Sequence, residues 1–139
     1  LEHPDWFDAL PGRYDTHYDG GEYNDLLLRL GDAEVRDRVA DFLEAWVDKY
    51  GIEWLRWDMN NSPQPIWQAT DPPGQRGWRQ LEYAEGLYAL LDAFMRRCPQ
   101  VSIEACSSGG YRMDLGTLRR AHTAWMCDNT DTHDPIRLM

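Results

Sequence analysis

The alternation of short apolar runs with helical segments is the feature that most constrains how this chain can fold. Four apolar runs have the length and composition of strands: residues 24–30, 52–58, 101–106 and 123–127. The segments between them have helical character: residues 31–51, 78–97 and 113–122. Strands and helices that alternate in this order are typical of parallel βαβ units. The sequence therefore predicts an α/β fold with four strands in a parallel arrangement, either a small open sheet or part of a barrel.

Residues 31–51 carry the complete signature of a helix. Asp32 stands at the N-cap position and Gly51 follows the last periodic residue, as helix ends prefer. The apolar residues between them fall on one face at helical spacing: Val35, Val39, Phe42, Leu43, Trp46, Val47 and Tyr50. By contrast, residues 1–23 and 59–77 are rich in turn residues and are predicted to be irregular. Loops as long as the second are usually functional or disordered, and Trp67 and Trp78 favour the functional interpretation.

The charge of the chain argues against two classes of partner. Its 24 acidic and 14 basic residues give a formal net charge of −10, which disfavours nucleic acid and anionic membrane surfaces. No apolar run reaches the roughly 18 residues that a membrane span needs. Seven Trp and seven Tyr against three Phe is a bias common in sugar sites, although ordinary core packing explains it equally well.

Neither the cysteines nor the histidines are spaced as metal ligands or as a disulfide framework. The cysteines are Cys98, Cys106 and Cys127, and the four histidines lie far apart in the sequence. We therefore expect buried or reduced thiols and no bound metal. No signal-peptide pattern is visible, so a cytoplasmic location is expected. Because the chain begins without Met, we also expect it to be a piece of a longer protein.

Carboxylates stand at the ends of three of the predicted strands. Asp58 ends the second strand, Glu104 lies in the third beside Cys106, and Asp128 follows the fourth with Asp131 close behind. In parallel α/β folds the chemistry collects at the C-terminal ends of strands. A glycosidase needs such a pair, one carboxylate as nucleophile or base and the other as proton donor. A divalent cation site, or purely structural caps and ion pairs, would use the same residues.

Structural interpretations of the individual carboxylates stay open at this point. Asp58 could pair with Arg56, because side chains two residues apart on a strand share a face, or it could cap the turn that follows. Asp128 could form only an Asx turn in the segment DNTD. Glu104 could be an internal ion-pair partner, and Cys106 could be a small buried hydrophobic residue.

Two long motifs resemble those of glycoside hydrolase family 36, the α-galactosidases often called melibiases. The segment WLRWDMN is followed at the family's spacing by IEACSSGGYRMDLGTLRRAHTAWMCDNTD. The family has KWDMN, then E-x-C-S-S-G-G-G-R-F-D leading to W-x-S-D-N-T-D, and the segments EHPDW and LGDAEVR also recur there. The resemblance covers nearly the whole chain. WDMN alone would be weak, since the related α-glucosidase family 31 uses a similar segment.

The resemblance implies a (β/α)8 TIM barrel and retaining hydrolysis of α-galactosides, without a metal or organic cofactor. A full barrel averages about 250 residues, so residues 1–139 would be a single segment of the catalytic barrel, about strands 3 to 6 with the intervening helices. By position, Asp58 would be the nucleophile and Asp128 the general acid/base. The substrate-binding residues would be Arg56, Trp57, Asn60, Cys106, Gly109 and Gly110. The partner would be a carbohydrate, and the full-length protein a possible homo-oligomer.

The same resemblance suggests what surrounds the two aspartates. Arg56 and Asn60 are expected to keep Asp58 ionised and oriented. Trp125 and Cys127 are expected to shield Asp128 from water.

Four departures from the family pattern concern the sugar rather than the reaction. The family lysine of KWDMN is Arg56, the arginine after DMN is Asn61, the third glycine of SSGGG is Tyr111, and a galactose-contacting arginine is Tyr23. Another α-linked sugar, such as N-acetylgalactosamine or glucose, or transfer to a second sugar is therefore an alternative. A non-catalytic sugar-binding module, an inactive fragment and a metal-dependent enzyme are the others.

Overall fold

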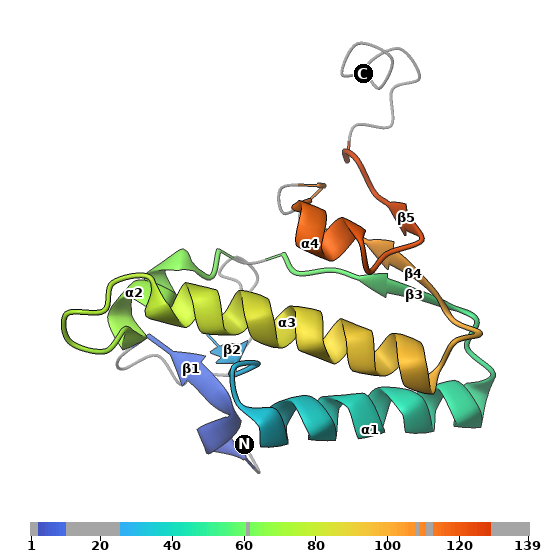
Figure 1. The fold of residues 1–139 in the computed structure, drawn as a ribbon, viewed down its shortest axis with the longest axis horizontal. Coiled ribbons are helices and arrows are strands. Elements are labelled where there is room, and N and C mark those ends of the chain that lie inside the picture. The colour runs from blue at the N-terminus through green and yellow to red at the C-terminus, as the bar shows by residue number, and fades with distance from the viewer. Residues whose placement is uncertain (1–2, 11–25, 61, 108, 111–112, 129–139) are drawn as a thin grey trace, which may run out of the picture.

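Three parallel strands, with two long helices packed on one face, organise the computed structural model of this chain (Figure 1). The structure describes residues 3–10, 26–60, 62–107, 109–110 and 113–128. Its elements follow in chain order: η1 Pro4–Trp6, β1 Phe7–Ala9, β2 Leu26–Leu28, α1 Ala33–Tyr50, β3 Trp54–Trp57, α2 Gln64–Thr70, α3 Trp78–Arg97, β4 Ser102–Ala105, α4 Leu115–Leu118 and β5 Thr123–Ala124.

The parallel sheet has the strand order β3-β4-β5, with β4 in the centre. Arg56 lies opposite Glu104, and Glu104 lies opposite Thr123, so one row of residues crosses all three strands. Backbone hydrogen bonds continue the pairing past the strand ends: the Cys106 N–H donates to the Trp57 carbonyl at 2.9 Å, and the Trp125 N–H to Ala105 at 2.8 Å. The C-terminal ends of the three strands therefore lie together at one edge.

The predicted helix at residues 31–51 is confirmed as α1, and both of its ends form for local reasons. The Asp32 side chain accepts a hydrogen bond of 2.9 Å from the Glu34 N–H at the first turn. Gly51 ends the helix in the left-handed conformation, at φ 62° and ψ 44°, where a side chain would be strained. The predicted helix at residues 78–97 is confirmed as α3. The predicted third helix forms only a short turn, α4.

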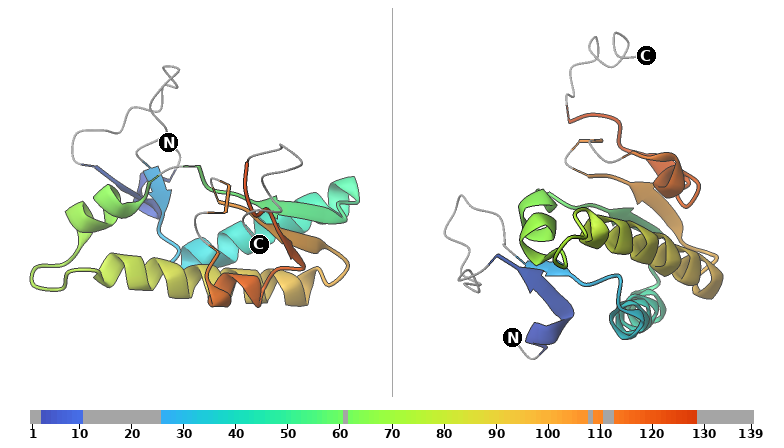
Figure 2. Two further views of the ribbon diagram at one scale, coloured as in Figure 1. Left: turned by 90° about the horizontal axis from the view of Figure 1, so that it is seen from above. Right: turned by 60° about the vertical axis from the view of Figure 1, so that its left-hand side comes forward.

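The hydrophobic core lies between the sheet and the two long helices, which lie side by side (Figure 2). Its fully buried members come from α1, α3 and β4 and the segments that flank them: Val47, Leu91, Phe94, Cys98, Val101 and Ile103. A second cluster joins Leu30, Ala40 and Leu90. Here α3 crosses the chain at Leu30 so closely that a β-carbon on Gly86 would lie 1.9 Å from the Leu30 carbonyl oxygen. Only glycine fits at that crossing.

The prediction that residues 24–30 form one of four parallel strands is wrong in the pairing of that strand. It forms β2, which pairs antiparallel with β1 in a separate two-stranded sheet. The hydrophobic pattern of an apolar run such as Leu26–Leu28 does not distinguish parallel from antiparallel pairing. The three-residue partner strand lies in residues 1–23, which were predicted to be irregular, and is too short to show an alternating pattern.

The expected irregular segment at residues 59–77 contains a helix, so that prediction is also wrong in part. Helix α2 runs from Gln64 to Thr70, and its prolines lie at its first turn, where a missing N–H costs nothing. After it, Asp71 accepts hydrogen bonds from the backbone N–H groups of Arg79 at 2.9 Å and Gly77 at 2.6 Å. These bonds hold the pKa of Asp71 below its ordinary value and fasten the start of α3.

An aromatic stripe runs along the exposed surface of α1. Phe42, Trp46 and Tyr50 are 55%, 48% and 57% exposed, and their successive ring centroids lie 5.3 and 5.2 Å apart. Within the described residues, no helix combines the length and apolarity needed to cross a membrane.

Candidate active site

Two of the predicted site residues, Arg56 and Asp58, lie on the face of the sheet opposite the helices. Along β3, Leu55 and Trp57 pack against the hydrophobic core. Because successive side chains on a strand point to opposite faces, Arg56 and the following Asp58 lie on the other face. Glu104, directly opposite Arg56 on β4, shares that face. The strand alternation thus separates a packed face from a face that carries charge.

Asp58 accepts hydrogen bonds on both of its carboxylate oxygens. Oδ1 accepts from the Met59 N–H at 2.8 Å, and Oδ2 accepts from the side-chain amide of Asn60 at 3.1 Å. Cys106 adds a hydrogen bond from the neighbouring strand end. Donors on both oxygens orient the carboxylate and favour its charged form.

The Cys106 thiol is protonated at neutral pH. Its residue is only 6% exposed, and burial raises the pKa of the thiol, with a further rise from the charge of Asp58 and its hydrogen bond. The Gly109 N–H, which bonds to the sulfur, acts in the opposite direction. Cys106 is therefore a hydrogen-bond donor to Asp58 rather than a thiolate.

The turn after β4 brings its backbone against the second predicted catalytic residue, Asp128. A β-carbon on Gly109 would lie 2.7 Å from Asp128 Oδ2, and one on Gly110 would lie 2.6 Å from the Met126 carbonyl oxygen. Both glycines have positive φ, 67° and 91°. They are required by close approach and by conformation alike. Through Cys106 and Gly109, one turn contacts both aspartates.

Asp128 also receives a hydrogen bond from an aromatic side chain. The indole Nε1–H of Trp125 donates to Asp128 Oδ1 at 2.8 Å. The sequence predicts Trp125 as a shield against water, and it does not reveal this donor role. Asp128 itself is exposed in the structure. No periodicity or motif marks a hydrogen bond between residues three apart in a segment without regular structure.

Arg56 forms an ion pair with Glu104, with 2.5 Å between Nε and Oε2. The guanidinium also lies over the Trp125 ring, 4.6 Å from its centroid. The interpretation of Glu104 as an ion-pair partner is therefore confirmed.

Trp57 lies on the opposite side of the sheet from Arg56. Its side chain lies on the helix side of the sheet and lines an apolar cavity of about 240 Å³, together with Met59, Trp67, Tyr83 and Cys106. The structure thus brings together Arg56, Asp58, Asn60, Cys106, Gly109, Gly110 and Asp128. The positions Tyr23, Asn61, Tyr111 and Asp131 lie outside the described residues.

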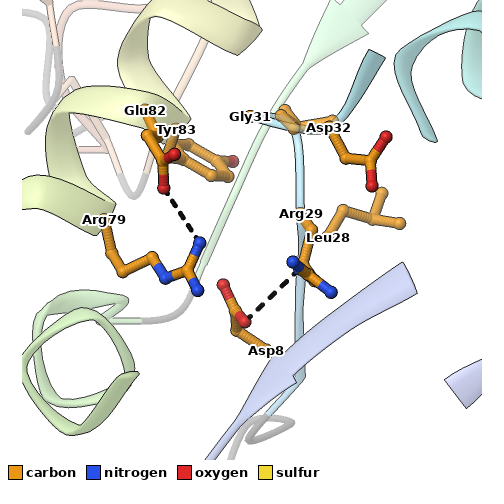
Figure 3. A pocket seen from close by; sticks show the side chains of 9 residues that line it. Asp8, Leu28, Arg29, Gly31, Asp32, Arg79, Glu82 and Tyr83 are labelled. Atoms are coloured by element: carbon orange, nitrogen blue, oxygen red, sulfur yellow. Dashed lines mark hydrogen bonds and ion pairs between the residues drawn. The ribbon is translucent and has the colours of Figure 1, made fainter. Parts of the chain in front are cut away.

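A charged pocket of about 160 Å³ lies elsewhere, between the β1-β2 hairpin and α3 (Figure 3). Asp8 and Arg29 face each other across it at 3.7 Å, and Arg79 pairs with Glu82 at 2.9 Å. Burial raises the pKa of Asp8 in spite of the two arginines, Arg79 and Arg29, that oppose the shift. None of the predicted site residues lines this pocket. In the described part of the chain, no group of three His, Cys, Asp or Glu side chains is arranged to hold a metal ion.

Known proteins are similar to this chain in sequence and in structure. The family model described as Melibiase matches residues 1–138. The alpha-galactosidase Mel36A of Lactobacillus acidophilus is 34% identical over 99% of this chain and 18% of its own length. The bifunctional alpha-galactosidase/sucrose kinase AgaSK of Mediterraneibacter gnavus is 32% identical over 98% of this chain and 13% of its own length. The chain thus spans less than a fifth of these relatives.

Solved structures of glycoside hydrolase family 36 superpose on the chain. The alpha-galactosidase AgaA of Geobacillus stearothermophilus has a TM-score of 0.74 at 32% identity, over 94% of this chain and 18% of that one. The alpha-galactosidase of Lactobacillus brevis has a TM-score of 0.76 at 28% identity, over 94% and 17%. Variants of AgaA have been solved in complex with stachyose and with raffinose.

Proposed function

The chain belongs to the melibiase family, and on that premise we propose that it supplies both catalytic carboxylates of a retaining α-galactosidase. The observation that carries the proposal is the turn that contacts Asp58 through Cys106 and Asp128 through Gly109. Two carboxylates from different strand ends, connected by one turn, meet the requirement of a glycosidase for a nucleophile and a proton donor.

In the proposed fold, residues 1–139 are one segment of a (β/α)8 barrel that belongs to a longer protein. The parallel strands β3, β4 and β5, with α1 and α3 on one face, have the arrangement of successive βα units. The opposite face, which carries Arg56, Asp58 and Glu104, would line the barrel interior. The site would then lie at the C-terminal ends of the strands, as in other barrel enzymes.

In the proposed mechanism, Asp58 attacks the anomeric carbon of the α-galactoside while Asp128 gives its proton to the glycosidic oxygen. The bond from the anomeric carbon to that oxygen breaks, and a β-linked glycosyl ester forms on Asp58. Asp128, now ionised, takes a proton from water, whose oxygen attacks the anomeric carbon and releases Asp58. The three donors to Asp58 hold it ionised and oriented for attack.

The proposed substrate class is taken from the relatives of the chain. An α-linked galactoside of the raffinose type is the expected substrate, because AgaA structures hold stachyose and raffinose. Arg56, where the family pattern has lysine, is bound to Glu104 and lies over Trp125. The arginine at position 56 therefore favours an alternative, in which the protein recognises a different α-linked sugar or transfers the sugar to a second one.

The test is an assay of the full-length protein with aryl α-glycosides of galactose, N-acetylgalactosamine and glucose. We expect release of galactose with retained configuration, measured by NMR before mutarotation. Asp58→Gly should abolish turnover, and added azide should restore consumption of the aryl substrate and yield the β-galactosyl azide. Asp37→Asn, an exposed change on α1, is the control for charge removal and should leave turnover intact. Full activity of Asp58→Gly without azide would overturn the assignment.

A further inference from the structure

We propose that the Arg56–Glu104 ion pair positions the carboxylate of Asp128 through the indole of Trp125. This inference rests on the proposed function, because it concerns the residue that would donate the proton. It assigns Arg56, Glu104 and Trp125 as positioning residues rather than catalytic ones. It also gives the arginine at position 56 a role other than contact with the sugar.

The first link is a fixed guanidinium. Glu104 lies on the central strand β4 and is 8% exposed, so its carboxylate has little freedom. Arg56 is its direct partner in the strand register, and Nε lies 2.5 Å from Oε2. A charge-assisted hydrogen bond to an anchored carboxylate fixes the plane of the guanidinium.

The second link is the contact between the guanidinium and an aromatic ring. The Arg56 guanidinium lies 4.6 Å from the centroid of the Trp125 ring, within the range of a cation–π interaction. A planar guanidinium can stack on the ring, whereas the ammonium of lysine is a compact point charge. The backbone of Trp125 is anchored separately, since its N–H donates to the Ala105 carbonyl at 2.8 Å. Trp125 is thus held at its backbone by β4 and at its ring face by the Arg56 guanidinium.

The third link reaches the carboxylate. The Trp125 Nε1–H donates to Asp128 Oδ1 at 2.8 Å, and Gly109 closes the side of Oδ2. Strand β5 ends at Ala124, so Asp128 lies four residues beyond regular structure. Its carboxylate is therefore positioned by contacts that originate on β3 and β4, and not by its own strand.

The inference makes a prediction that depends on the leaving group. A displaced acid slows glycosidic cleavage when the departing oxygen needs a proton, and matters little when the leaving group is already a stable anion. The test measures kcat/KM of the full-length enzyme for a phenyl and a dinitrophenyl α-galactoside. For Trp125→Phe, which keeps the ring and removes the N–H, we expect a loss of about 10- to 100-fold with the phenyl substrate. The loss with the dinitrophenyl substrate should be no more than about threefold.

Arg56→Lys and Glu104→Gln should show the same pattern with smaller losses, and Trp46→Phe on the exposed face of α1 is the matched control. With the dinitrophenyl substrate, kcat of Trp125→Phe should be limited by hydrolysis of the glycosyl ester, for which Asp128 acts as general base. Azide needs no general base, so added azide should restore this kcat. In an Asp128→Ala background, Trp125→Phe should cause no further loss, since the two changes act on one step. This double-variant comparison tests whether Trp125 acts through Asp128 even where a single variant is less stable.

Equal losses with both substrates, or additive losses in the Asp128→Ala background, would overturn the positioning role. A rise in KM without a leaving-group effect in Arg56→Lys would instead indicate direct contact with the sugar, and would also overturn it. Failure of the unaltered full-length protein to hydrolyse any α-galactoside is a separate outcome. It would refute the proposed function before any variant is compared.

Discussion

A β-carbon on Gly109 would lie 2.7 Å from the Oδ2 atom of Asp128, well inside van der Waals contact. Gly109→Ala should therefore displace the carboxylate and lower kcat/KM by about 100-fold or more, the scale of losing a positioned acid/base. At φ 67° the alanine would also cost roughly 1–2 kcal/mol in backbone strain.

Gly74→Ala is the matched control for that substitution. Gly74 has a similar φ of 77°, but a β-carbon there would meet no atom within 4 Å. Both variants should lower the midpoint of thermal unfolding through backbone strain, Gly109→Ala by at least as much because of the added clash, and only Gly109→Ala should lose activity. Equal activity losses would show that strain, and not contact with Asp128, is responsible.

Gly86→Ala should destabilise the fold although alanine is the better helix former. Propensity alone would favour alanine in the middle of α3 by about 1 kcal/mol. The clash with the Leu30 carbonyl oxygen, at 1.9 Å, requires the backbone to shift, and overpacking of this kind costs roughly 1–3 kcal/mol. Urea unfolding should therefore show a net loss of stability. Ala89→Gly, at an exposed position of the same helix, should cost about 1 kcal/mol from propensity alone.

Cys106→Ala should reduce kcat by about tenfold, because one hydrogen bond to the charged Asp58, worth roughly 1.5 kcal/mol, is lost. Cys106→Ser keeps a donor of similar size and should retain most of the activity. Since burial raises the pKa of the Cys106 thiol, alkylation by iodoacetamide should be slow at pH 8, and the half-buried Cys127 should react first. Rapid labelling of Cys106 in the native protein would contradict this description, and mass spectrometry identifies the labelled residue.

Asp8→Asn should be neutral or stabilising at pH 7, in spite of the lost ion pair with Arg29. Burial raises the pKa of Asp8, so the folded state binds its proton more tightly than the unfolded state does. The stability that Asp8 contributes is thus fully present below its ordinary pKa and is lost as the pH rises through the folded value. The advantage of Asp8→Asn should shrink as the pH falls from 7 toward 4, measured by urea unfolding. Asp48→Asn, exposed on α1, controls for the change in net charge.

The 139-residue segment alone should be inactive and should self-associate. The stripe of Phe42, Trp46 and Tyr50 is exposed, and in the described residues β3 pairs with β4 on one edge only. Open edges and exposed aromatic surface promote association. Trp46→Lys should reduce the apparent mass seen by light scattering, whereas Arg38→Lys on the same helix should not. Robust turnover by the monomeric segment would contradict the expectation.

The parts of the fold that depend on neighbouring residues could be predicted from the sequence. Asp32, Gly51 and the apolar spacing between them determine α1 locally, and its bounds were predicted within two residues. The orientation of β2 could not be predicted, because it depends on pairing with Phe7–Ala9, a strand of three residues that is too short to show an alternating pattern. Helix α2 was missed because its prolines were interpreted as breakers, whereas the first turn accepts them.

The candidate site likewise has features that could be predicted from the sequence and features that could not. Asp58, Cys106 and Asp128 could be named from motifs, and the strand ends bring them to one edge. The contacts that orient them could not, because they join residues from different strands. The contact of the Arg56 guanidinium with the Trp125 ring requires the parallel register of β3 with β4 and of β4 with β5, and no single segment contains that information.

The short turn from Cys106 to Gly109 has a stereochemical consequence. In retaining glycosidases the two carboxyl groups are about 5–5.5 Å apart, and in inverting ones about 6.5–9.5 Å, which leaves room for a water molecule. Because Cys106 hydrogen-bonds to Asp58 and Gly109 lies against Asp128, we expect the backbone between them to set the distance between the two carboxylates. Inserting one glycine directly before Gly109 should therefore move Asp128 relative to Asp58, and the anomeric configuration of the sugar released by the full-length protein would show whether their separation has changed class.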